Sequence, residues 1–228
     1  MNYISFRGVT TNSLGLYVAQ MPSHKKAKQR DTEYESPGRN GAVAILDGYS
    51  PFDLRAVVYM PGGDALMRQT INAWADGTGD LFTSDDTSKV WKASVLREVQ
   101  YSRRLIGDKF HDTATITFRC QPVMREREPG TVSFVGQTTL LNIGNVEAYP
   151  LIVVKGSGRC TLTVGNETIT LEGVTEDVTI DSEAGYVYTP SGAVAMKGEF
   201  PVLPLDTTKI TSDGGVTQVI ITPRWGWI

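Results

Sequence analysis

The segment NIGNVEAYPLIVVKG, residues 142–156, places a turn directly before an apolar run. Asn142, Gly144 and Asn145 are residue types that favour turns, because asparagine bonds to its own backbone and glycine adopts unusual dihedral angles. The run at 151–154 has the composition of a buried strand. We therefore expect the two asparagines and the glycine to shape the turn, without binding a ligand, and the run to be the first core strand of a β domain.

Strand signals continue on the C-terminal side of this segment at the spacing typical of a β-sandwich. The expected strands cover residues 131–135, 151–154, 160–164, 168–171, 178–180, 186–188 and 216–222. On its N-terminal side, REREPG at 125–130 combines alternating charge with proline and glycine, which is typical of a connector. The sequence thus predicts two domains, residues 1–130 and 131–228, the second a jelly-roll β-sandwich.

The first half also consists mainly of strand signals, interrupted by one amphipathic helix. The expected strands cover residues 4–8, 16–19, 42–46, 52–59, 90–99 and 113–120. The helix is predicted to start after Asp64, which can cap free amides, and to end before Gly77. Its apolar face is predicted to carry Leu66, Thr70, Ile71 and Trp74.

Two further features of the first half are a hairpin and an arm. The polar residues 84–88 between two strand signals predict a tight hairpin that contains Asp85 and Asp86. Residues 23–40 are rich in charge and glycine and are predicted to form a long loop or arm that becomes ordered against a neighbour. The arm contains Lys25, Lys26, Lys28, Arg30 and Arg39.

The composition is that of a folded globular protein, with 40% hydrophobic and 21% charged residues. Lys and Arg minus Asp and Glu is 17 − 15 = +2 up to Gly130 and 5 − 10 = −5 after it. This balance argues against a nucleic-acid-binding protein, which needs a concentrated basic face.

The two cysteines suggest buried free thiols. The lack of a signal sequence or long apolar segment predicts a soluble protein made in a cytoplasm.

The sequence offers few residues for catalysis or metal binding. His24 lies in the charged arm and His111 before a strand, and neither has a nucleophile motif nearby. The hairpin aspartates lack the spacing of a calcium loop. Asp181 and Glu183 could act as a glycosidase pair, but a turn explains them better. We expect no catalytic residue, no metal and no cofactor.

Two other patterns have both a structural and a functional interpretation. Gly156 and Gly158 resemble half a phosphate-binding loop, but no helix follows them, so a hairpin between two strands is favoured. The aromatic residues of the second half could line a sugar platform or pack in a core or interface. These residues are Tyr149, Tyr186, Tyr188, Trp225 and Trp227.

Several segments resemble, in the same order, the distal tail proteins of long-tailed bacteriophages. The first half contains FRG at 6–8, SLGL at 13–16, GRNG at 38–41, INAWADGTGDLFTSDDT at 71–87 and TATITFRCQP at 113–122. The second half continues with the 142–156 segment, TEDVTIDSEAGYVY at 175–188 and GEFPVLPLD at 198–206. The resemblance spans nearly the whole chain. It departs at 205–210, where a glycine and an asparagine are expected and absent.

This resemblance implies a structural hub of the tail-tip baseplate. The first domain would be a belt that forms a homohexameric ring, and the second a galectin-like sandwich. The ring contacts are expected within residues 23–41, including Lys25, Lys26, Lys28, Arg30 and Arg39, and on edge strands of the first domain. Expected partners are a second copy, the tail tube protein and the tail-tip protein, with a receptor-binding protein as a further one.

The resemblance places the protein in the virion, at the distal end of the tail, and implies no enzyme activity, no sequence-specific nucleic-acid binding and no membrane insertion. The alternative is a lectin-like carbohydrate-binding module that recognises host cell-wall polysaccharide, because fold alone does not determine function.

Overall fold

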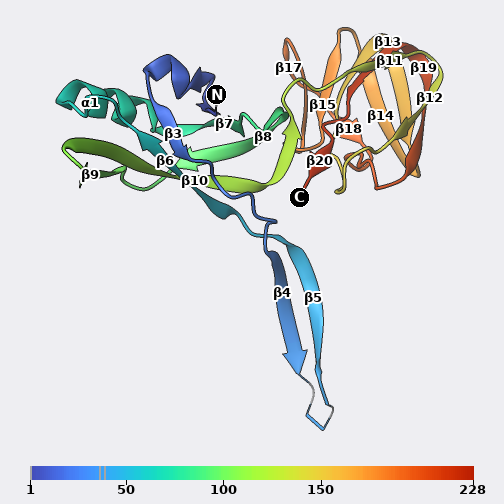
Figure 1. Ribbon diagram of the computed structural model, residues 1–228. Coiled ribbons are helices and arrows are strands. Elements are labelled where there is room, and N and C mark those ends of the chain that lie inside the picture. Colours follow the sequence, from blue (N-terminus) through green and yellow to red (C-terminus); the bar gives the residue numbers. More distant parts are fainter. Residues whose placement is uncertain (1, 36, 39) are drawn as a thin grey trace. The chain divides into compact units, whose positions relative to one another are not determined.

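The computed structural model describes residues 2–35, 37–38 and 40–228 and contains two compact units. Unit 1 comprises Met1–Met124 with Ile228, and unit 2 comprises Arg125–Trp227. The division falls at the start of the 125–130 segment that the sequence indicates as a connector. Figure 1 shows that strands dominate both units, and α1 (Ala65–Trp74) is the single α helix of the described chain. The predicted fold class, mostly β with one helix and two β-rich parts, is confirmed.

Unit 1 contains one large sheet and a separate two-stranded sheet. Within the large sheet the order is β2-β1-β7-β8-β10-β6-β3, and β9 also pairs with β10. The two-stranded sheet consists of β4 and β5. The elements of the unit are β1 (Ile4–Phe6), β2 (Val9–Thr10), the 3-10 helix η1 (Asn12–Leu14), β3 (Tyr17–Gln20), β4 (Gln29–Glu35), β5 (Ala42–Tyr49), β6 (Phe52–Tyr59), α1, β7 (Gly77–Thr83), β8 (Asp86–Val95), β9 (Gln100–Ile106) and β10 (Lys109–Glu126), which runs into unit 2.

Alternation along the strands gives the large sheet one buried face. On β10, Ala114, Ile116, Phe118 and Cys120 are fully buried, while the threonines between them are only partly covered. Phe118 meets Phe6 edge to face, with 5.2 Å between ring centroids. This apolar layer is the core of unit 1.

Helix α1 attaches to that core through its last two turns. Asp64 caps it by accepting a hydrogen bond from the Met67 amide at 2.8 Å, as the sequence predicts. Ile71 and Trp74 are buried, and the Trp74 indole N–H lies 3.3 Å from the Phe6 carbonyl oxygen. The prediction for Leu66 was wrong, because this side chain is 69% exposed. No helix of the described chain is long and apolar enough to cross a membrane.

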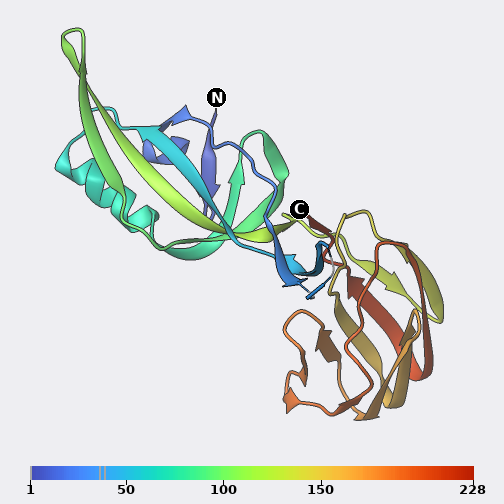
Figure 2. The same cartoon turned by 90° about the horizontal axis from the view of Figure 1, so that it is seen from below.

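The large sheet of unit 1 contains two hairpins, β7–β8 and β9–β10. The predicted hairpin around 84–88 is confirmed, because β7 pairs with β8 up to Thr83 opposite Asp86. Asp86 accepts hydrogen bonds from the Ser88 amide and hydroxyl, and the hydroxyl bond lowers the pKa of this carboxyl. The other hairpin, β9–β10, is green in Figure 2. Its first strand, β9, was not predicted from the sequence.

Unit 2 is organised around its two longest strands, β13 and β19. The strand order is β11-β19-β13-β15-β16-β17, with β12 paired to β19, β14 to β13, and β18 to β14. The strands are β11 (Val132–Phe134), β12 (Gln137–Leu141), β13 (Leu151–Val164), β14 (Glu167–Val174), β15 (Val178–Asp181), β16 (Tyr186–Thr189), β17 (Gly192–Ala193), β18 (Met196–Lys197), β19 (Thr207–Thr222) and β20 (Gly226–Trp227). Where the sequence resemblance broke down, at 205–210, the chain begins β19.

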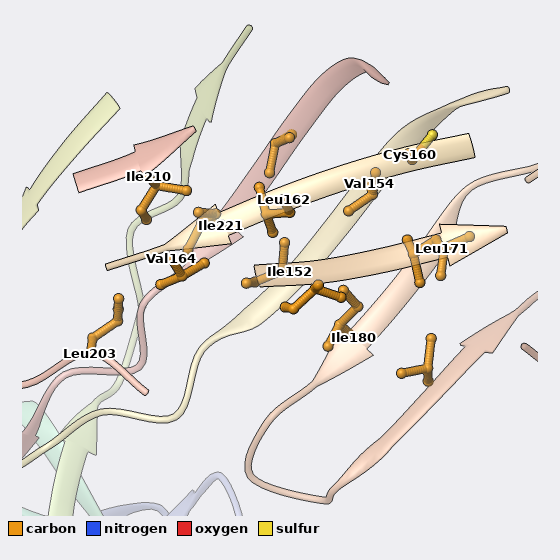
Figure 3. Packing of buried hydrophobic residues seen from close by; sticks show 14 of the residues in the cluster. Ile152, Val154, Cys160, Leu162, Val164, Leu171, Ile180, Leu203, Ile210 and Ile221 are labelled. Carbon is orange, nitrogen blue, oxygen red and sulfur yellow. The ribbon is translucent and has the colours of Figure 1, made fainter. Parts of the chain in front are cut away.

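The core of unit 2 lies between these strands. Ile152, Val154 and Ile221 are fully buried, and Figure 3 shows them in one apolar cluster with Ile180 of the neighbouring strand β15 and with Leu162 farther along β13. Ile152 lies opposite Ile221 on β19 and opposite Ile180 on β15, so one isoleucine contacts two strands. The run at 151–154 is therefore a core strand, as predicted.

The hairpin predicted at Gly156 and Gly158 is wrong. Both glycines lie inside the continuous strand β13, where the pairing with β19 shifts register between Lys155 and Cys160. A Cβ on Gly156 would come within 2.4 Å of the Gly215 carbonyl oxygen. The glycines thus allow a β-bulge and a close approach of two backbones.

The turn before β13 is built by Asn142, as the sequence predicts. Its side-chain amide, buried in the unit, donates to the carbonyl oxygens of Val146 and Pro204, each at 3.0 Å, and to that of Leu203 at 3.3 Å. Its side-chain oxygen accepts from the Gly144 amide at 2.8 Å. Asn142 therefore joins the turn to the segment before β19.

Both cysteines are buried free thiols, in agreement with the sequence prediction. Burial raises the pKa of Cys120 to about 12 and also raises that of Cys160. The folded protein should therefore present little thiolate at neutral pH.

Candidate interaction surface

The predicted arm is largely an extended hairpin and not a loop. Residues 29–35 form β4, which pairs with β5 from Gln29 opposite Tyr49 to Glu35 opposite Ala42. Every residue of β4 is exposed, as is every residue of β5 except Tyr49. Figure 1 shows this pair as a two-stranded ribbon of its own. The charged composition that predicted a loop instead reflects a strand pair with no buried face.

The pairing register sorts the side chains of the hairpin onto two faces, because residues directly opposite each other share a face. One face carries Thr32 and Tyr34 from β4 together with Ile45 and Val43, their partners on β5. Tyr34 is 58% exposed, Val43 67% and Ile45 54%. This set of four residues is the apolar face of the hairpin.

The opposite face is acidic. It carries Asp31, Glu33 and Glu35 from β4, opposite Leu46, Ala44 and Ala42 of β5. The hairpin is therefore amphipathic in the way of a half-buried sheet, although neither of its faces is covered.

A two-stranded hairpin is at best marginally stable in water, because it buries too little apolar surface to offset its conformational entropy. Exposed strand edges also offer unpaired backbone groups to another chain. Burying a Val, Ile or Tyr side chain contributes about 1.5 to 3 kcal/mol. An amphipathic hairpin with an uncovered apolar face thus has the properties of an interface.

Four of the five predicted arm residues are described, and they lie near the base of this hairpin. Lys25 and Lys26 are exposed beside a cavity of about 210 Å³ whose lining includes Phe52 and Trp91. The Lys28 carbonyl oxygen accepts a hydrogen bond from the Ser50 amide at 2.8 Å. Arg30 donates to the Asp47 carbonyl oxygen on β5, also at 2.8 Å. Arg39 lies outside the described residues.

The sequence prediction named the basic residues of the arm and missed its apolar face. Thr32 and Tyr34 alternate with acids along the strand, and Val43 and Ile45 alternate with alanines. This period of two was the available signal.

A second exposed apolar group lies on the β9–β10 hairpin. Leu105, Ile106 and Phe110 are 58%, 56% and 63% exposed. Nearby, Arg103 forms a bidentate ion pair with the buried Asp112 at 2.7 and 3.0 Å, and these hydrogen bonds lower the pKa of Asp112. The hairpin is therefore anchored by an ion pair while its apolar side chains stay exposed.

The candidate catalytic residues His24 and Asp181 take part in contacts that stabilise the fold. His24 lies on the surface, 3.1 Å from Asp85 and edge to face with Trp91. Asp181 accepts hydrogen bonds from the amides of Glu183 and Ala184 at 3.1 Å, so the predicted turn is confirmed. In the part of the chain that the structure describes, no three His, Cys, Asp or Glu side chains gather in a group that could hold a metal ion.

The five aromatic residues of the second half do not form one platform. Trp225 is buried, and Trp227 packs against the core of unit 2. Tyr186 and Tyr188 remain exposed and lie side by side, with 5.4 Å between ring centroids. Tyr149 is 38% exposed.

These features define a two-unit β protein with one helix and an exposed, amphipathic hairpin. The same fold occurs in the Dit protein of phage SPP1, whose crystal structure matches with a TM-score of 0.80 at 15% identity, covering 100% of both chains. That protein is described as a paradigm of the hub adsorption apparatus in phages that infect Gram-positive bacteria. The predicted resemblance to distal tail proteins is therefore confirmed at the level of the fold.

Two structures of the phage p2 baseplate in its activated conformation are more distant. The strontium form gives a TM-score of 0.44 at 8% identity over 97% of this chain and 98% of that one. The calcium form gives 0.43 at 7% identity over 94% and 99%. No family model matches the chain. No curated protein matches it either.

Proposed function

We propose that this chain is a structural hub protein at the distal end of a phage or prophage tail. Copies join head to tail through unit 1 into a six-membered ring. The ring connects the tail tube to the tail-tip protein and to a receptor-binding protein, and DNA passes through it without being read. The protein acts by assembly and load transmission and carries out no reaction.

The observation that carries this proposal is the β4–β5 hairpin, whose apolar face is uncovered in the single chain. A closed ring needs two different complementary patches on each copy. The apolar face of the hairpin is one such patch. The exposed apolar group of Leu105, Ile106 and Phe110 on the next copy is the other. The full-length fold likeness to a phage hub protein supports the same function.

The basic arm residues have an accessory role in this proposal. Lys25, Lys26, Lys28 and Arg30 lie at the base of the hairpin, and Arg39 belongs to the same segment of sequence. Their charges would steer two copies together and fix their orientation, an effect that weakens with salt. The apolar face would supply most of the affinity.

Native mass spectrometry and negative-stain electron microscopy of the purified chain test the proposal. We expect six-membered rings in the wild type, and monomers after Tyr34, Val43 and Ile45 are all changed to serine. The matched control is Val135→Ser with Ile143→Ser, since these unit 2 side chains are 67% and 58% exposed, like Val43 and Ile45. The control should keep the rings.

Two results would contradict the proposal. A wild-type chain that stays monomeric and binds neither the tail tube protein nor the tail-tip protein of the same phage would exclude a hub. Rings that persist in the triple serine variant would show that the hairpin does not hold them together.

A further inference from the structure

The outer surface of β16 in unit 2 carries two aromatic rings that the core does not use. Tyr186 and Tyr188 lie on one side of the strand, whereas Val187 between them points into the core. The rings are 51% and 38% exposed, with centroids 5.4 Å apart and planes inclined by 35°. They form a continuous aromatic surface two residues long.

This surface is held in place by strand pairing on both sides. Tyr188 lies opposite Thr179 on β15 and opposite Ala193 on β17, and Tyr186 lies opposite Asp181. A rigid aromatic surface loses little entropy when a ligand binds, because the rings are already oriented.

Charged groups that donate and accept hydrogen bonds lie next to the rings. Asp181, the cross-strand neighbour of Tyr186, forms a bidentate ion pair with Arg224 at 2.7 and 3.1 Å. Glu183 lies 3.5 Å from Arg224 and accepts a hydrogen bond from Arg125 at 3.1 Å. The four side chains carry two negative and two positive charges, so the group is neutral as a whole.

The backbone of this group is also unusual. Arg224 has a φ of +58°, a left-handed conformation that a non-glycine residue rarely adopts. It is held by Asp181 at its side chain and by Arg125, which donates to its carbonyl oxygen at 2.7 Å. Strained residues of this kind concentrate at binding sites. Hydrogen bonding to Asp181 raises the pKa of Arg224, so its guanidinium keeps its charge.

We infer that Tyr186 and Tyr188, together with the Asp181, Glu183 and Arg224 group, form a binding site for a neutral polysaccharide. The flat C–H face of a pyranose ring stacks on an exposed tyrosine ring, and two adjacent tyrosines fit consecutive sugars. The half-exposed Glu183 carboxylate has lone pairs, and the Arg224 guanidinium N–H groups, for the hydroxyls at the sugar edges, while Asp181 holds Arg224 in place.

The charges favour a neutral glycan over a charged one. The side chains beside the rings sum to zero, and residues 131–228 have a net charge of 5 − 10 = −5. An anionic wall polymer would be repelled by this part of the chain, and a cationic ligand would meet two carboxylates already paired with arginines. Hydroxyl groups form hydrogen bonds without adding charge.

Saturation-transfer-difference NMR of the full chain tests the inference, with cellohexaose, maltohexaose, chitohexaose and phosphate-free bacterial wall polysaccharide as probes. We expect transfer to at least one of these neutral glycans, and a loss of affinity of tenfold or more in Tyr186→Ala with Tyr188→Ala. Phenylalanine at both positions should retain most of the affinity, because the ring faces remain.

The matched control is Tyr17→Ala. Tyr17 is 44% exposed and lies beside Tyr59 with 6.5 Å between centroids and an inclination of 33°, a similar tyrosine pair in unit 1. It has no part in the proposed site, so glycan binding should not change. Thermal unfolding of each variant verifies that the chain remains folded.

The inference is overturned if none of the four neutral probes binds, if the double alanine variant binds as well as the wild type, or if teichoic acid binds better than every neutral glycan. It is independent of the proposed ring. The triple serine variant of the β4–β5 hairpin should lose rings and keep glycan binding, whereas the double alanine variant should show the reverse.

Discussion

The β4–β5 hairpin and the β13–β19 pair are both antiparallel strand pairs, but only the second has a buried face. Ile152 on β13 is fully buried, while Ile45 on β5 is 54% exposed. Backbone hydrogen bonds contribute little net stability in water, so the burial of side chains decides whether a strand pair is stable. The β13–β19 pair is therefore stabilised by side-chain burial within its own unit, whereas the β4–β5 pair has no buried face to stabilise it.

The largest expected effect comes from truncating the same residue type in both pairs. Ile152→Ala should lower the free energy of unfolding by about 2 to 5 kcal/mol, because it leaves a cavity in the core of unit 2. Ile45→Ala should change it by less than about 0.5 kcal/mol in dilute, monomeric protein. Urea denaturation followed by circular dichroism measures both values. Equal effects would remove the distinction between the two strand pairs.

The second effect concerns the hydrogen bonds of Asn142 in the turn before the core strand β13. Asn142→Ala should cost about 2 to 3 kcal/mol, because three buried or partly buried carbonyl oxygens lose a donor and the Gly144 amide loses its acceptor. No comparable side-chain network ties the described part of the hairpin tip. The control is Asn166→Ala in the exposed turn between β13 and β14, which should change the unfolding midpoint in urea little. A midpoint in Asn142→Ala equal to that of the wild type would refute this role.

The sequence predicted these two strand pairs with unequal success. The run at 151–154 and the Asn142 turn were predicted because apolar and turn-forming residues are local signals. Strand β4 was missed because its glutamates and arginine indicate solvent exposure, and exposure in a strand pair looks like exposure in a loop. The sequence predicts a hairpin at Gly156 because glycine favours both hairpin turns and bulges, and only the contact with Gly215, far away in the sequence on β19, distinguishes the two. The period of two marks an apolar side on each strand, but which residues of β4 and β5 share a face depends on the pairing register, which no local pattern gives.

A third test uses pH to compare unit 2, where Asp181 forms an ion pair with Arg224, with the β4–β5 hairpin. Hydrogen bonds from Arg224 lower the pKa of Asp181 in the folded protein. A depressed folded pKa contributes stability that is fully present above the unfolded value, about 3.9, and is lost as pH falls through the folded value. Asp181→Asn should therefore cost about 1 to 2 kcal/mol at neutral pH, and less and less below about pH 4.

The measurement is the difference in unfolding free energy between wild type and Asp181→Asn from pH 3 to pH 8. Glu183→Gln is the control, because this side chain is 51% exposed and should contribute little. Glu33→Gln on the acidic face of the hairpin should leave the monomer unchanged across the same range. A difference that grows as the pH falls would contradict the assignment of the Asp181 pKa.

The smallest effect concerns α1, which is intermediate between the two strand pairs because one side is exposed and the other carries the buried Ile71 and Trp74. Asp64→Ala removes the hydrogen bond to the Met67 amide and should cost about 1 kcal/mol. Asp64→Asn should cost only a few tenths of a kcal/mol, because asparagine caps helices about as well as aspartate. Thermal unfolding of the two variants gives the comparison. If both variants lose the same amount, the charge of Asp64 stabilises the helix start and the hydrogen bond does not, so that α1, like the hairpin, would gain little from its local hydrogen bonds.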